Sequence, residues 1–108
     1  MKTTSVYFAN DAKQAVVTPA LWQWDYGQQI IVHGLNLPAS YTVHIGFTGN
    51  ETLEVYQCRN NAITIPDRYL ETGNEILIFI CLADDSTENT SYLIRCPVRK
   101  RAKPTNEE

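Results

Sequence analysis

The stretch WQWDYGQQIIVHGLNLPASYTVHI, residues 22–45, shows most clearly what kind of fold to expect. Three aromatic residues at alternate positions precede a short apolar strand at 29–33. A turn at 34–38, rich in glycine, asparagine and proline, leads to a second strand at 41–48, in which apolar and polar residues alternate. Alternate side chains of a strand lie on opposite faces, so one face of the second strand should be buried. The stretch therefore predicts one layer of a β domain, with the aromatic residues just before its first strand.

The most hydrophobic run outside this stretch is Glu75–Ala83, which shows no alternation. Since a strand that is apolar on both sides is typically covered on both faces, we expect it to be a central strand. A charge placed at Ile78 or Phe79 should then abolish folding. A buried helix is the competing interpretation, but the β-branched residues and the flanking turns favour a strand.

The remaining chain reads as short segments separated by turn residues. Further strands are predicted at 4–8, 15–18, 52–58, 62–65 and 92–99, one helical turn at 66–73, and irregular structure or a helical turn at 20–26. About seven or eight short strands with at most one short helical turn are typical of an all-β domain. We expect an antiparallel two-sheet β-sandwich, Ig-like or jelly-roll-like.

The composition excludes several classes of protein. At 108 residues the chain is expected to form one domain, and 44% hydrophobic residues exclude wholesale disorder. The net charge of −3 argues against nucleic acid as a general partner. The sequence begins without an apolar signal segment and contains no run of membrane-spanning length. We therefore expect neither a signal peptide nor a membrane partner.

The three cysteines are expected to be reduced thiols. Their number is odd, and their spacing does not match a zinc site. A single Cys81–Cys96 disulfide remains possible. However, a hairpin around the 84–89 loop would place Cys81 opposite Tyr92 and Cys96 opposite Leu77, a register that disfavours the disulfide.

The chain changes character at its C-terminal end. Residues 1–99 are expected to form the sandwich domain and residues 100–108 a charged tail or the start of a linker. The basic residues Arg99, Lys100, Arg101 and Lys103 are assigned to this linker. Residues after about Lys100 should be poorly ordered or held only by their neighbours. Removal of 102–108 should leave the melting temperature nearly unchanged, and the reading frame should continue past Glu108.

No set of residues predicts a catalytic centre, a metal site or a cofactor. His33 and His44 lie on successive strands and could face each other, but ordinary strand positions are the favoured interpretation. The acidic run at 84–88 could hold calcium weakly, although a solvated hairpin tip is favoured. We therefore expect a protein that is not an enzyme.

The alternating aromatic residues Trp22, Trp24 and Tyr26 are the candidate contact residues. On one face they could stack on sugar rings, as in carbohydrate-binding β-sandwiches. They could equally close one end of the sandwich or pack against a partner subunit, where Trp and Tyr are favoured. Closing one end of the sandwich and packing against a partner subunit are together preferred over glycan binding.

Several motifs resemble a known family. They are WQWDYGQ at 22–28, GLNLP at 34–38, YTVH at 41–44, the Ile-Pro-Asp to Thr-Gly pattern at 65–73, and the closing segment at 97–106. Together they resemble the N-terminal domain of baseplate upper protein-like structural proteins from prophage tails of Gram-positive gut bacteria. The resemblance implies a non-enzymatic module that docks to other tail or baseplate subunits and forms oligomers. It also implies location in the bacterial cytoplasm during assembly and in the virion tail afterwards.

Overall fold

The computed structural model describes residues 2–8, 15–49, 52–83 and 89–103, which hold ten β-strands and one 3₁₀ turn, η1. The elements are β1 Lys2–Tyr7, β2 Ala15–Val17, β3 Leu21–Trp22, β4 Gln28–His33, β5 Ser40–Phe47, β6 Glu54–Arg59, β7 Ala62–Thr64, η1 Asp67–Leu70, β8 Ile76–Ala83, β9 Asn89–Cys96 and β10 Val98–Arg99. The predictions of an all-β chain and of one short helical turn are confirmed. Within the described residues, no helix has the length and apolar character needed to cross a membrane.

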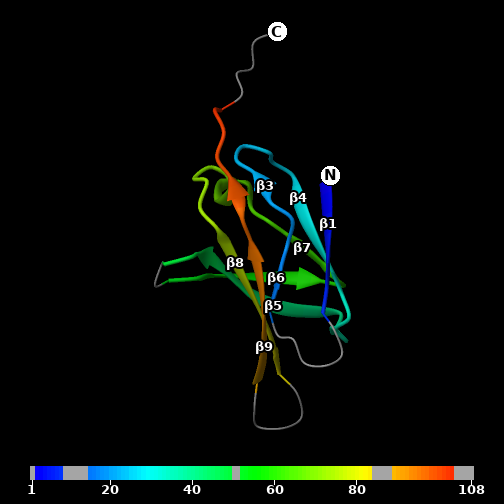
Figure 1. The fold of residues 1–108 in the computed structure, drawn as a ribbon. Coiled ribbons are helices and arrows are strands. Elements are labelled where there is room, and N and C mark those ends of the chain that lie inside the picture. The colour runs from blue at the N-terminus through cyan, green and yellow to red at the C-terminus, as the bar shows by residue number, and fades with distance from the viewer. Residues whose placement is uncertain (1, 9–14, 50–51, 84–88, 104–108) are drawn as a thin grey trace.

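Eight strands form one mixed sheet in the order β1-β4-β7-β6-β5-β8-β9-β2 (Figure 1). The pairs β1–β4 and β2–β9 are parallel, and the other neighbours are antiparallel. The outermost strands, β1 and β2, approach each other, so the sheet curls toward a barrel. β3 and β10 form a separate parallel pair. The prediction of an antiparallel two-sheet sandwich is corrected to a single mixed sheet, nearly closed on itself.

The incorrect prediction of a two-sheet sandwich has a physical cause. Alternation in a sequence indicates which side chains point inward, but it identifies neither the partner of a strand nor its direction. A strongly curled sheet encloses an apolar interior just as two packed sheets do. The interior here is formed mainly by aliphatic residues of β4, β5, β7, β8 and β9. Its fully buried members are Ile30, Val43, Ile45, Ile63, Ile65, Leu70, Ile76, Ile78, Ile80, Ile94 and Cys96.

The run Glu75–Ala83 contains the predicted central strand, β8, which pairs with β5 on one side and β9 on the other. The expectation that both of its faces are covered is wrong. Its inward residues Ile76, Ile78 and Ile80 are completely buried, whereas Leu77 and Phe79 on the outward face are only half-buried. Neither outward side chain belongs to the core or packs against it.

The β8–β9 hairpin is shifted by one residue from the predicted register. Cys81 pairs with Ser91, and Cys96 pairs with Ile76. The two cysteines are therefore far apart along the hairpin, and all three cysteines are free thiols, as expected. Burial raises the pKa of the Cys96 thiol to about 12.

The two strands within 22–45 also lie apart. β4 and β5 belong to the same sheet, but β7 and β6 lie between them. The turn after β4 instead brings Gly34 against the backbone of Phe8, at the end of β1. The segment expected to be irregular begins with β3, which pairs with β10 near the C-terminal end of the described chain.

Candidate functional site

The aromatic residues Trp22, Trp24 and Tyr26 lie on a turn that leaves β3, not along one face of a strand. Trp24 has a positive φ of 72°, and the Asp25 N–H donates to the Trp22 carbonyl (3.1 Å), which closes the turn. Trp22 is 43% exposed, Tyr26 is 39% exposed, and Trp24 is half-buried. None of the three packs into the hydrophobic core. The segment therefore does not plug the interior.

The basic residues of the predicted linker lie against this segment. The Arg99 guanidinium is 5.5 Å from the centre of the Trp22 ring, and the Lys103 ammonium is 5.1 Å from that of Trp24. The Trp24 indole Nε1–H also donates to the Arg101 carbonyl (3.2 Å). Two of the candidate aromatic rings are thus contacted by cations of the same chain.

Gln23 provides most of the hydrogen bonds to the C-terminal segment. Its N–H donates to the Arg99 carbonyl (2.9 Å), and its side-chain oxygen accepts from the Arg101 N–H (3.1 Å). The Arg101 Nε–H donates to the Gln23 carbonyl (2.7 Å), and the Lys100 side chain covers Gly73. Residues 100–103 therefore make more contacts than we expected. Their role as the start of a linker stays a prediction.

These contacts predict how two truncations will differ. Deleting residues 102–108 removes the Lys103–Trp24 contact, which at an exposed site is worth about 0.5–1 kcal/mol. Deleting 100–108 also removes the three hydrogen bonds of Arg101, each worth about 0.5–1.5 kcal/mol. The longer deletion should lower the melting temperature clearly more than the shorter one, as measured by calorimetry. Equal melting temperatures would show that the Arg101 contacts add nothing to stability.

The other side of the aromatic segment is held by η1 and the residue that follows it. The Tyr26 hydroxyl donates to Glu71 Oε2 (2.6 Å), and this bond to a carboxylate raises the pKa of Tyr26. The Gly27 N–H donates to Asp67 (3.0 Å), and the Trp24 N–H donates to the Leu70 carbonyl (2.8 Å). The segment thus connects η1 to the C-terminal residues at one end of the sheet.

The two histidines do not meet. His33 on β4 lies 3.2 Å from Ser5 Oγ and packs edge-on against Tyr7, whereas His44 on β5 has its Nδ1 3.7 Å from Cys81 Sγ. No group of three or more His, Cys, Asp or Glu side chains comes together in the part of the chain that the structure describes. The acidic run at 84–88 lies outside the described residues.

An outer apolar face is the largest feature that the sequence did not predict. We define it by six side chains on the outward side of the sheet, five on strands and Leu53 just before β6: Val17, Leu53, Val55, Leu77, Phe79 and Leu93. Directly opposed residues share a face of a sheet, and the pairs Val55–His44, His44–Phe79 and Phe79–Leu93 form one continuous row. A second row runs from Leu77 through Arg95 to Val17.

Leu53 completes the face because its side chain lies on Gly46, where a Cβ atom would overlap it. Val17 and Val55 are 62% and 61% exposed, although both are apolar. Arg95, which lies between Leu77 and Val17 in the second row, forms an ion pair with Glu75 (3.3 Å). The sequence could not place all of them outward, because the run that contains Leu77 and Phe79 shows no alternation. The order of the strands then brings the six residues together.

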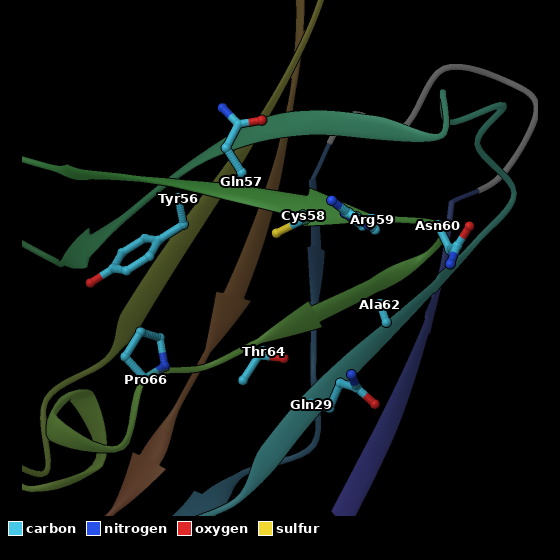
Figure 2. Close-up of a pocket in the computed structure, with 9 residues that line it drawn as sticks. All are labelled: Gln29, Tyr56, Gln57, Cys58, Arg59, Asn60, Ala62, Thr64 and Pro66. Carbon is cyan, nitrogen blue, oxygen red and sulfur yellow. The ribbon is translucent and has the colours of Figure 1, made fainter.

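A hollow of about 450 Å³ lies on another part of the sheet, between β6 and β7 (Figure 2). These strands pair only through Arg59 and Ala62 and then diverge. Its lining comes from β4, β6, β7 and their connections: Gln29, Tyr56, Gln57, Cys58, Arg59, Asn60, Ala62, Thr64 and Pro66. No motif in the sequence predicted this opening.

No protein-family model matches the chain. No curated protein matches it either. The function must therefore be argued from the surfaces of the molecule and from the motifs quoted above.

Proposed function

We propose that this chain is a non-enzymatic structural module that joins protein subunits, with the outer apolar face as its docking surface. The supporting observation is the row of apolar side chains left outside the core on β6, β8, β9 and β2. Soluble domains rarely expose contiguous apolar surface unless a partner covers it. Phe79 and Leu77 lie near the middle of the face, where interface residues contribute most to binding.

The occupant we propose is a second copy of this chain. The face carries both members of the Glu75–Arg95 pair, so its charge is balanced. Under a two-fold axis, Arg95 of one copy can lie near Glu75 of the other while the apolar centres meet. A surface with both charges and an apolar centre is thus complementary to itself.

The proposal predicts a dimer that one substitution disrupts. Phe79→Asp places a charge at the centre of the face and should weaken self-association by about 30-fold or more, as expected for an interface hot spot of about 2 kcal/mol. Sedimentation velocity over a range of concentrations measures this change. Trp22→Ala lies away from the face and serves as the control, which should still dimerise. A wild-type protein that stays monomeric at every concentration would contradict the proposed occupant.

A place in a phage tail or baseplate is the wider role that we propose. It rests on the resemblance of the motifs at 22–44 and 65–73 to the N-terminal domains of prophage baseplate proteins. In such an assembly the partners are other tail subunits as well as copies of this chain. Mass spectrometry of purified virions tests this role, because a structural module should be present at a fixed ratio to the other tail proteins.

Glycan binding by Trp22, Trp24 and Tyr26 is the second candidate function. The observation in its favour is that Trp22 and Tyr26 are large exposed aromatic residues at one end of the sheet. A sugar that stacked on Trp24 would share the ring with Lys103. Loss of glycan-array binding in Trp24→Ala would favour this function over the docking role.

A further inference from the structure

We propose that the hollow between β6 and β7 is a second binding site, which takes a neutral sugar ring. This site is separate from the outer apolar face and from the aromatic segment at 22–26. Its volume of about 450 Å³ falls within the range of about 300–1,000 Å³ that is usual for small-molecule sites. The inference does not depend on the docking role proposed above.

The shape of the hollow follows from two closed ends. At one end, the Arg59–Ala62 pair holds β6 and β7 together. At the other, Arg68 of η1 contacts Glu54 and donates from Nη2 to the Tyr56 hydroxyl (2.8 Å). The opening is thus bounded along the strands. An extended peptide cannot run through it as an added strand, whereas a compact ring can enter from the solvent side.

The lining has the chemistry that recognises hydroxyl groups. Gln29, Asn60 and Thr64 border the opening, and none of their side chains hydrogen-bonds to another described residue. A carboxamide both donates and accepts, as a sugar hydroxyl does, so the two groups pair without any net charge. Gln57, in contrast, already donates to Thr42 Oγ1 (2.8 Å) and is directed away from the opening in Figure 2.

Apolar and aromatic groups complete the lining. The Tyr56 and Pro66 rings lie at the η1 end, and Ala62 and Cys58 contribute small side chains (Figure 2). A sugar ring combines an apolar C–H face with a polar edge, which suits an aromatic side chain beside carboxamides. Arg59 is the one charged residue among the nine that line the hollow, and its guanidinium supplies donors to hydroxyl oxygens.

The residue opposite the lining residue Cys58 carries a buried hydroxyl. Tyr41 pairs with the lining residue Cys58 across β5 and β6, so their side chains share the inner face. The Tyr41 hydroxyl is buried and has no hydrogen-bond partner among the described residues. Burial raises the pKa of Tyr41 to about 12.

NMR titration of the ¹⁵N-labelled protein tests the site. The sugars are D-glucose, D-galactose and N-acetyl-D-glucosamine, each added to about 100 mM, because single sugars are expected to bind with millimolar affinity. At least one sugar should cause saturable shifts at Gln29, Asn60 and Thr64. The double variant Gln29→Leu with Thr64→Val keeps the volume of the lining. It should bind about tenfold more weakly, because two hydrogen bonds are lost. Ala62→Trp fills the opening and should abolish the shifts while the rest of the spectrum stays unchanged.

Trp24→Ala is the matched control, since it alters the aromatic segment and leaves the hollow intact. It should bind the same sugars with unchanged affinity. Absence of saturable shifts with all three sugars would overturn the proposal. So would shifts confined to residues 22–26, which would place the sugar on the aromatic segment. The peptide acetyl-Val-Thr-Val-amide is the competing probe. Shifts at Gln29 and Thr64 with this peptide, and with none of the sugars, would assign the hollow to a peptide instead.

Discussion

Replacing Ile78 with aspartate should leave the chain unfolded, whereas the same replacement at the next residue, Phe79, should leave it folded. Ile78 is completely buried and pairs with Ile45 on β5 and Ile94 on β9, which are also completely buried. An unpaired charge at such a site costs several kcal/mol, comparable to the total stability of about 5–15 kcal/mol for a small domain. No described cation lies in this row to compensate it.

The Phe79 side chain lies on the outer apolar face, where an aspartate can reach water. Far-UV circular dichroism and urea denaturation of both variants measure the difference. Before the strand order is known, Ile78 and Phe79 look equivalent, because the run that contains them shows no alternation. Loss of folding in both variants would mean that a part of the chain outside the described residues covers the outer face.

Gly34→Ala should destabilise the protein by several kcal/mol, far more than Gly27→Ala. Gly34 has a φ of +91°, and a Cβ atom there would overlap the carbonyl oxygen of Phe8. The Phe8 N–H donates to the His33 carbonyl (2.9 Å), so the two backbones cannot separate without losing this bond. A backbone clash of this kind adds to the cost of about 1–2 kcal/mol for a left-handed alanine.

Gly27 is the matched control because it has a similar φ of +80° but no atom within 4 Å of the added Cβ. Gly27→Ala should cost only about 1–2 kcal/mol, the conformational part alone. The midpoints of urea denaturation compare the two variants directly. If both variants lost the same free energy of unfolding, the close approach of the Phe8 backbone to Gly34 would not restrict the side chain at position 34.

The sequence predicted the inward residues of β1, β5 and β9 and the central position of β8, because these depend on local patterns. Isoleucines at every second position of β8 point inward, and turn residues bound the strand. The partners of the strands could not be predicted in the same way. Nothing local to β1 shows that it pairs in parallel with β4, because that pairing depends on how the intervening segment folds back.

The same difference between local patterns and long-range pairing explains which parts of the candidate sites could be predicted. Trp22 and its aromatic neighbours were evident as a cluster, but the residues that contact them lie at the other end of the chain, at 99–103. Val17 and Phe79 form one surface only because β9 lies between β2 and β8. The hollow forms because β6 diverges from β7. The one local sequence feature near it is Pro66, which follows the strand predicted at 62–65.

The parallel pairs also determine the order in which the protein can fold during synthesis. β2 pairs with Leu93–Arg95, and β3 pairs with Val98–Arg99, so these early segments wait until residues 93–99 have left the ribosome. The hairpins β5–β6 and β8–β9 join residues that are close in sequence and can form first. β1 can pair with β4 early, but β2 and β3 have no partner strand until β9 and β10 have been made. A nascent chain of this topology therefore exposes β2 and β3 for longest, and a chaperone that shields them would limit wrong contacts.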